Sequence, residues 1–248
     1  MNANFLKKIL LNSYRAKKSA VEFENNHELK KLYWIFESSP ESGWILGKTE
    51  ALTLFKLIKK YRPKNALDLG LGIGASSAIM AYASDEDALV TSVEQFPKCI
   101  ALAKKLIPQN LQRKIGFVFS EPYAFKNDLI SRYSYFSGYK NLPVERGFFD
   151  FLLIDGPGAW LENGQFIKLP NGDLINLLPH LAPGCKILVD GRRSAVELYK
   201  RFLTNYLNVI EKDKSYTLME RSSKKLDGIG SIEIKDVSLE ARAKENYF

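Results

Sequence analysis

A glycine-rich stretch at residues 65–77 most strongly limits how this chain can fold. It reads Asn-Ala-Leu-Asp-Leu-Gly-Leu-Gly-Ile-Gly-Ala-Ser-Ser. Its apolar run at 66–71, broken by glycines at alternate positions and followed by small residues, is typical of a buried parallel strand that turns sharply into a helix. Gly70, Gly72 and Gly74 permit positive φ angles and let a ligand approach the main chain. The pattern predicts a turn whose amides face an electron-rich group; a turn without a ligand is the simpler interpretation.

Two acids extend this pattern. Asp68 lies inside the apolar run, where an unpaired carboxylate is costly to bury. Glu94 closes a second apolar run at 89–93, about twenty residues after the last glycine. Nucleotide-binding folds place there the acid that accepts hydrogen bonds from ribose hydroxyls. The two acids therefore favour a bound ligand over a plain turn.

In these residues the chain resembles the class I S-adenosylmethionine-dependent methyltransferases. The resemblance extends over residues 48–235 and rests on the motif at 68–74, on Glu94 and on the run Phe-Asp-Phe-Leu-Leu-Ile-Asp-Gly-Pro at 149–157. It implies S-adenosyl-L-methionine as the cofactor, bound by Asp68, by the three glycines of the motif and by Glu94.

The resemblance also implies polar contacts to the adenine ring just after the third strand of the sheet. Ser120 and Glu121 occupy that position, behind an expected strand at 115–119. A surface turn is the alternative interpretation of these two residues.

Apolar runs alternate with amphipathic segments as far as residue 206, and short strand-like runs follow. We expect strands at 66–71, 90–93, 115–119, 148–154 and 186–189, helices at 49–61, 75–83, 97–107, 174–181 and 194–206, and further strand-like runs at 208–210, 216–220 and 231–235. This order predicts an α/β fold with a doubly wound, mostly parallel seven-stranded sheet, helices on both faces and an antiparallel C-terminal hairpin.

Residues 126–145 combine tyrosines with lysines and serines. Interleaved aromatic and basic side chains can stack on nucleic-acid bases. A helix with a packed aromatic face is the interpretation that we adopt. We expect a long loop at 159–171.

We interpret residues 1–47 as a helical extension that can cover the site, and residues 48–248 as the methyltransferase-like domain. Trp44 is assigned to the substrate as a lid residue, with a core anchor as the alternative. Residues 1–20 are basic and amphipathic, which predicts a helix packed on its own domain or one resting on an anionic membrane surface. No apolar run reaches the length of a membrane span or a signal-peptide core. We therefore expect a cytoplasmic protein, with peripheral membrane contact as an option.

The chain has 248 residues and a formal net charge of +8, but its basic residues occur as scattered pairs. Scattered pairs are typical of solvated faces, so a small molecule is favoured over nucleic acid as the partner. The sequence contains two cysteines and two histidines. These are too few for a disulfide framework or a histidine-based metal site.

Asp155 and Asp190 close two of the expected strands, at the sheet edge where open α/β folds bind their ligands. Methyl transfer to a hydroxyl or amine requires an aligned acceptor that loses a proton. We therefore predict that Asp155 or Asp190 is the general base, although Asp155 can instead brace a turn. Arg192 and Arg193 are assigned to an anionic group of the acceptor, with surface charge at a helix start as the alternative.

Some small-molecule O-methyltransferases with this core hold a divalent cation between the ends of the fourth and fifth strands. This chain resembles them at Asp155 and in part at Asp190. They have an Asp-Asn pair after the fifth strand, whereas Asp190 is followed by Gly191 and Arg192. Two carboxylates can still hold magnesium with waters, but because a guanidinium repels a cation, we predict a metal-independent enzyme.

These inferences together predict a methyltransferase that acts on an oxygen or nitrogen of a small or sugar-like acceptor, with an anionic acceptor as one option. The glycine motif also fits the dinucleotide pattern that ends in alanine. Three alternatives therefore stay open: an NAD(P)-linked oxidoreductase, an aminopropyl transferase on a related fold, and a nucleic-acid-modifying or non-catalytic binding protein.

Overall fold

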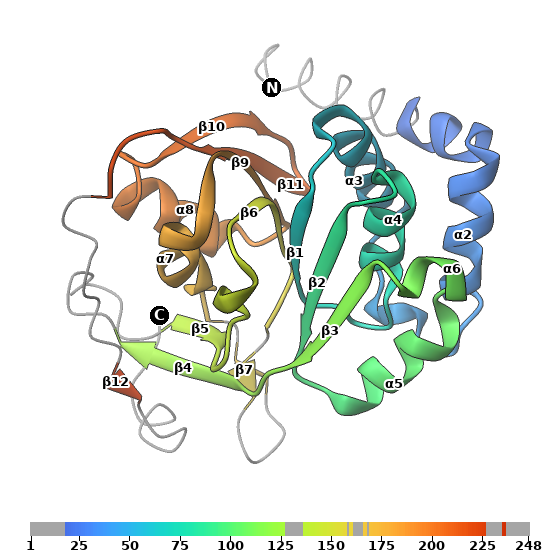
Figure 1. The fold of residues 1–248 in the computed structure, drawn as a ribbon, viewed down its shortest axis with the longest axis horizontal. Helices are drawn as coiled ribbons and strands as arrows, with labels where there is room; N and C mark the ends of the chain where they lie inside the picture. Colours follow the sequence, from blue (N-terminus) through green and yellow to red (C-terminus); the bar gives the residue numbers. More distant parts are fainter. Residues whose placement is uncertain are drawn as a thin grey trace, which may run out of the picture.

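A seven-stranded sheet forms the centre of the molecule (Figure 1). The computed structural model describes residues 18–126, 136–157, 159–160, 166–167, 169–226 and 235–236. In spatial order the strands are β10 (Leu207–Lys212), β11 (Tyr216–Arg221), β9 (Leu181–Asp190), β6 (Phe149–Ile154), β1 (Asn65–Leu69), β2 (Leu89–Glu94) and β3 (Ile115–Phe119). The strands from β9 to β3 pair in parallel, and β11 pairs antiparallel with both β9 and β10. The predicted fold class is confirmed.

Helices cover both faces of this sheet, as Figure 1 shows. They are α2 (His27–Glu37), α3 (Lys48–Tyr61), α4 (Ala75–Ala83), α5 (Pro97–Leu106), α6 (Gln109–Gln112), α7 (Asp173–Leu177) and α8 (Arg193–Phe202), with 3-10 turns η1 (Ser42–Trp44), η3 (Val144–Arg146) and η4 (Leu178–His180). Alternate residues of β6 enter different cores because side chains alternate across a strand. Phe151 and Leu153 join the core under α2 to α6, whereas Leu152 and Ile154 join the core under α7 and α8.

The strand order reverses between β1 and β6. From β1 the chain moves outward through β2 to β3, then returns to place β6 on the other side of β1. Crevices beyond the carboxyl ends of strands at such a reversal are the usual ligand sites of open α/β sheets. The fold therefore predicts a site above β1 and β6.

Two small sheets were not anticipated from the sequence. β5 (Phe136–Tyr139) pairs with β4 (Pro122–Lys126), which also pairs with β12 (Lys235–Asp236), and β7 (Ala159–Trp160) pairs with β8 (Phe166–Ile167). The helix expected at 126–145 is therefore wrong for Phe136–Tyr139, and the loop expected at 159–171 contains a short hairpin. All of β5 is buried, so no alternation of polar and apolar residues marked it as a strand.

The helix expected at 174–181 is also shorter than predicted. α7 ends at Leu177, and the turn η4 contains Pro179, which has no main-chain N–H to continue an α-helix. β9 then starts at Leu181, and its register against β6 shifts between Phe149 and Phe151. Regular pairing resumes at Lys186, where the predicted strand begins.

The segment before α3 packs on the same core as α3 and α4. Residues 18–25 are helical, and Phe23, Leu29 and Phe36 are buried in that core. The amphipathic pattern of residues 1–20, with its membrane option, lies mostly outside the described residues, which begin at Lys18. In the described part of the chain, no helix is long and apolar enough to span a membrane.

Candidate active site

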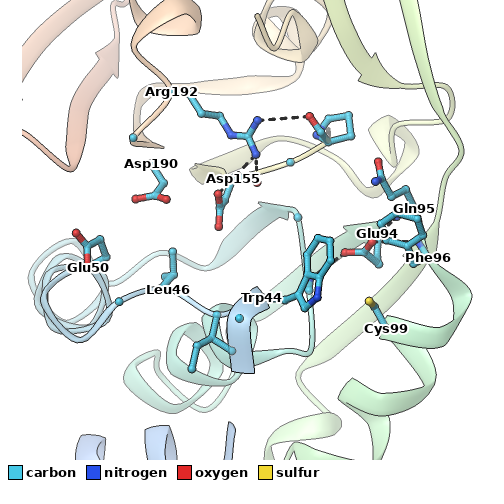
Figure 2. Close-up of a pocket in the computed structure, with 18 of the residues that line it drawn as sticks. Trp44, Leu46, Glu50, Glu94, Gln95, Phe96, Cys99, Asp155, Asp190 and Arg192 are labelled. Carbon is cyan, nitrogen blue, oxygen red and sulfur yellow. Dashed lines mark hydrogen bonds and ion pairs between the residues drawn. The ribbon is translucent and has the colours of Figure 1, made fainter. Parts of the chain in front are cut away.

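A cavity of about 580 Å³ lies at the carboxyl ends of β1, β2, β6 and β9. This volume suits a small-molecule ligand. Its lining residues come from the segment before α3 (Gly43, Trp44, Ile45, Leu46, Gly47), from α3 (Glu50), from β1 and β2 and the segments after them (Gly70, Gly72, Glu94, Gln95, Phe96, Cys99), from β5 (Tyr139), from β6 and β9 and the segments after them (Asp155, Gly156, Pro157, Asp190, Gly191, Arg192) and from the turn between β10 and β11 (Ser215). Figure 2 shows two ends: Trp44 beside Glu94 and Phe96, and Glu50, Asp155 and Asp190 grouped apart from them.

The glycine turn brings the main chain close to two neighbouring segments. Gly70 has a φ of 110°, and a Cβ there would lie 2.7 Å from the nitrogen of Gly156. Gly72 has a φ of 53°, and a Cβ there would lie 2.5 Å from the carbonyl oxygen of Trp44. Both positions therefore require glycine for conformation and for close approach.

Glu94 is fixed by main-chain amides at the opposite side of this turn. Its Oε2 accepts from the amide of Gly72 over 2.8 Å, and its Oε1 accepts from Gln95 and Phe96 over 2.9 and 3.0 Å. Burial raises its pKa, whereas the three amides act in the opposite direction. Because a carboxylate offers about four acceptor positions, Glu94 retains one for a hydroxyl in the cavity.

Asp68 and Gly74 are not among the residues that line the cavity. Asp68 is fully buried, and its Oδ2 accepts from the hydroxyls of Ser76 and Ser77 over 2.7 and 2.5 Å. Burial raises its pKa to about 6. A Cβ at Gly74 would lie 2.9 Å from Ala103 Cβ. The contacts of Asp68 thus join β1 to the start of α4, and Gly74 lets α5 pack closely.

Ser120 and Glu121 also lie apart from the cavity lining. The Ser120 hydroxyl is buried and accepts from the amide of Asn141 over 2.8 Å. The Glu121 side chain is 64% exposed, with Lys140 Nζ 3.9 Å from its carboxylate. The adenine contacts expected at these residues stay a prediction.

Asp155 and Asp190 come together at one end of the cavity, and Glu50 faces them from α3 (Figure 2). The charges of the two aspartates interact, since each carboxyl influences the pKa of the other. Burial raises the pKa of both carboxyls, and the pKa of Asp190 is raised further by the charges of Asp155 and Glu50. Two half-buried carboxyls with raised pKa values can share one proton, so the pair can accept or release a proton near neutral pH.

Arg192 turns toward the main chain of the segment that follows β6. Its Nη2 donates to the carbonyl of Asp155 and its Nη1 to that of Pro157 over 3.4 Å, while Nη2 lies 3.6 Å from Asp155 Oδ1. Arg193 is exposed and is not among the lining residues. The two arginines assigned together from the sequence therefore have different surroundings.

Trp44 lies at the Glu94 end of the cavity. The residue is 55% exposed, and its ring meets the Phe96 ring edge-on, with 6.1 Å between centroids. This position is away from the carboxyl pair (Figure 2). Within the described ranges, no group of three or more His, Cys, Asp or Glu residues is arranged to hold a metal ion.

Several lining residues were not selected from the sequence. Glu50 belongs to an amphipathic helix whose acids resemble any solvated charge, and Tyr139 belongs to the unpredicted β5. Gln95 and Phe96 follow Glu94 directly, so the rule that places ligands beyond strand ends was the signal that could have identified them.

No family model and no curated protein matches the chain. Solved structures match it over most of its length. The SAH-bound methyltransferase PaMTH1 of Podospora anserina is 13% identical, with 86% of this chain and 97% of that chain covered and a TM-score of 0.56. TomG of Streptomyces achromogenes, an O-methyltransferase of tomaymycin synthesis in complex with SAM, is 15% identical, with coverage of 86% and 97% and a TM-score of 0.54.

The O-methyltransferase of Bacillus cereus in complex with SAH is 15% identical, with coverage of 80% and 91% and a TM-score of 0.51. The chain has the class I methyltransferase fold. At these identities the likeness establishes the fold, and a fold hosts many activities. The chemistry of this chain therefore depends on the residues that line its cavity.

Proposed function

We propose that the chain is an S-adenosylmethionine-dependent methyltransferase that transfers a methyl group to an oxygen or nitrogen of a small acceptor. The observation that carries this proposal is one cavity with two unlike ends. At one end Glu94, fixed to Gly72, keeps an acceptor position for a hydroxyl. At the other end Asp155 and Asp190 form a carboxyl pair of raised pKa.

The cofactor fits the first end. Gly70 and Gly72 both line the cavity, so a ligand that lies along the turn meets main chain without a side chain in the way. Glu94 would accept from one ribose hydroxyl, and Trp44 and Phe96 would flank the nucleoside. The bound cofactor would supply an already activated methyl group on a sulfonium.

The protein must then align the acceptor and remove its proton. Asp155 or Asp190 would accept that proton, because a base with a raised pKa is matched to neutral pH. Structures of the methyltransferase PaMTH1 and of TomG with SAH and SAM support the same cofactor for this chain.

The charges at the second end favour a neutral or cationic reacting group over the anionic one expected from the sequence. Among the described lining residues Arg192 is the only cation, and its Nη1 and Nη2 groups donate to main-chain carbonyls. Glu50, Asp155 and Asp190 all face the space that the acceptor would fill. Arg193 remains a candidate for an anionic substituent that projects outside the cavity.

Ligand-dependent melting and a labelled-methyl screen test this function. A ligand that binds only the native state stabilises it by RT ln(1 + [L]/Kd), about 2.7 kcal/mol at one hundred times Kd. We expect SAH and S-adenosylmethionine to raise the melting temperature and NAD to leave it unchanged. In the screen, hydroxyl and amine acceptors without an anionic group should receive label. A shift with NAD and none with SAH would replace the methyltransferase with an oxidoreductase.

A further inference from the structure

The segment after β6 has an unusual main-chain environment, because each of its three carbonyls accepts a hydrogen bond from a side chain. Arg192 donates to the carbonyls of Asp155 and Pro157, the latter over 3.4 Å. Asn171 Nδ2 donates to the carbonyl between them, that of Gly156, over 2.7 Å. Two side chains thus hold the segment at three successive points.

The side-chain amide of Asn171 is held in place by several hydrogen bonds. Its side chain is 1% exposed. Nδ2 donates both to Gly156 and, over 2.9 Å, to Oδ2 of Asp173, while Oδ1 accepts from the amide of Asp173 over 3.0 Å. The Tyr199 hydroxyl lies 2.8 Å from the main-chain oxygen and from Oδ1 of Asn171. Both donors of the amide and one acceptor position are occupied, and the one O–H of Tyr199 is shared between Oδ1 and the main-chain oxygen, so the orientation of the amide is fixed.

This network joins the segment to three elements of the fold. Asp173 opens α7 and accepts from the amide of Tyr139 in β5 over 2.9 Å, and Tyr199 lies in α8, which begins directly after Arg192. Asp173 and Tyr199 have no exposed surface. Because a buried polar group that loses its partner is costly, such a network resists partial opening.

Close packing opposes movement from the remaining side. A Cβ at Gly156 would lie 2.5 Å from the Tyr139 hydroxyl and 2.8 Å from the Cα of Gly70. The amide of Asp155 also donates to the carbonyl of Leu69 over 2.8 Å. The hydrogen-bonded segment is therefore pressed against the glycine turn.

We propose that Asn171 is a positioning residue: together with Arg192 it holds residues 155–157 so that the Asp155 carboxylate stays against Asp190. This inference rests on the proposed function, in which that pair accepts the acceptor's proton. Asn171 does not line the cavity and acts only through the carbonyl of Gly156. A misplacement of about 1 Å at a reacting group costs on the order of 100-fold in rate, so a remote amide at this position has a large effect.

The test uses the full chain with 13C-labelled aspartate and follows the carboxyl signals of Asp155 and Asp190 from pH 4 to pH 9. Asp155→Asn and Asp190→Asn assign the signals. In the wild type we expect two apparent pKa values separated by more than about one unit, because the groups interact. In Asn171→Ser the separation should fall below about one unit, since the segment no longer keeps the carboxyls together. A merely structural role would leave these signals unmoved in a folded protein.

A second variant and a control keep the result decisive. Tyr199→Phe retains the ring in α8 but removes the hydroxyl that contacts Asn171. It should narrow the separation between the two apparent pKa values to a smaller degree than Asn171→Ser does. This variant still tests the proposal if Asn171→Ser fails to fold. Ile115→Val removes one buried methyl group at the far end of β3 and should leave the separation unchanged. Unaltered titration in every folded variant, or equal narrowing in the Ile115→Val control, would overturn the proposal.

SAH binding, measured by calorimetry on the same proteins, separates this inference from the proposed function. We expect the wild type and Tyr199→Phe to bind SAH within about twofold of each other, since neither the ring nor Asn171 lines the cavity. A wild type that does not bind SAH, but whose carboxyl pair still loosens in the variants, would refute the methyltransferase and leave the positioning role of Asn171 intact.

Discussion

The main-chain amide of Gly72 donates a hydrogen bond to Oε2 of Glu94 over 2.8 Å, so the turn after β1 and the acid that closes β2 form one unit. Glu94 also accepts from the two amides that follow it. Any ligand that binds Glu94 therefore meets a carboxylate whose orientation is already set, which lowers the cost of ordering the site on binding.

Glu94→Gln should weaken SAH binding by about 10- to 100-fold, the usual value of a hydrogen bond to a charged group. The glutamine side chain would also point an N–H group at main-chain amides that now donate to the carboxylate. Calorimetric titration of SAH measures the loss. Glu86→Gln makes the same change at an exposed residue before β2 and should bind SAH like the wild type; equal affinity in both variants would remove Glu94 from the binding site.

Gly72→Ala should destabilise the protein more than Gly184→Ala, although both glycines have positive φ. An alanine at positive φ costs about 1–2 kcal/mol. Nothing lies within 4 Å of a Cβ at Gly184, whereas a Cβ at Gly72 would lie 2.5 Å from the carbonyl oxygen of Trp44. Urea unfolding of the two variants isolates this clash. We also expect SAH affinity to fall in Gly72→Ala and not in Gly184→Ala. Equal losses of stability in the two variants would show that the contact with the Trp44 carbonyl does not add to the cost.

The strand, turn and helix around the glycines could be predicted because local sequence determines them. α4 begins at Ala75 and ends at Ala83 as expected, since the glycines and the small residues leave few alternatives. β5 could not be predicted, because Phe136 and Tyr139 are buried alike and show no period of two. The division of the chain at residue 47 stays a prediction.

The site could be predicted where it follows from strand ends and not where it depends on packing. The rule for strand ends predicts Asp155 and Asp190, the spacing after the glycine motif predicts Glu94, and all three line the cavity. Glu50 reaches them only because α3 packs beside those ends. Asp68 carries the same kind of sequence signal as Glu94, but the hydroxyls of α4 occupy its Oδ2. A sequence does not reveal which partner a buried carboxylate will find.

Stability should fall as the pH rises through the range in which Asp173 ionises. Burial raises the pKa of Asp173 from 3.8 to about 7, so between these values the native state holds a proton that the unfolded chain has released. The contribution of Asp173 to the free energy of unfolding is fully present below the unfolded pKa and is lost as the pH rises to the folded pKa. The total loss is on the order of a few kcal/mol. Urea unfolding from pH 4 to pH 8 should show this decline, and Asp173→Asn should lack its share. Leu111→Ala, a comparably disruptive change elsewhere, should retain the wild-type slope; an identical slope in Asp173→Asn would refute the assignment.

Magnesium should change neither the melting temperature nor the affinity for SAH. The carboxyls of Asp155 and Asp190 both have raised pKa values, and Arg192 Nη2 lies 3.6 Å from Asp155 Oδ1. A cation would have to displace a proton and approach a guanidinium, which costs electrostatic energy. Melting curves with millimolar magnesium and with chelator test this expectation. Stabilisation that depends on magnesium and disappears in Asp190→Asn would establish a metal site at the pair.

Trp44 should report cofactor binding rather than acceptor binding. The residue is 55% exposed and its ring touches Phe96 at the Glu94 end of the cavity, so a nucleoside seated there would cover it. SAH should therefore change the tryptophan fluorescence of the wild type, and Trp44→Phe should lose most of that change while its affinity for SAH falls about tenfold, the value of one stacking contact of 1–3 kcal/mol. Trp34→Phe alters an exposed ring on α2, 65% accessible and absent from the cavity lining, and should retain both the fluorescence change and the affinity. Trp44→Phe could instead bind SAH normally but methylate a different set of acceptors in the labelled-methyl screen. In that case Trp44 is a lid residue for the substrate, as the sequence predicts, and the cofactor lies deeper, toward Gly70.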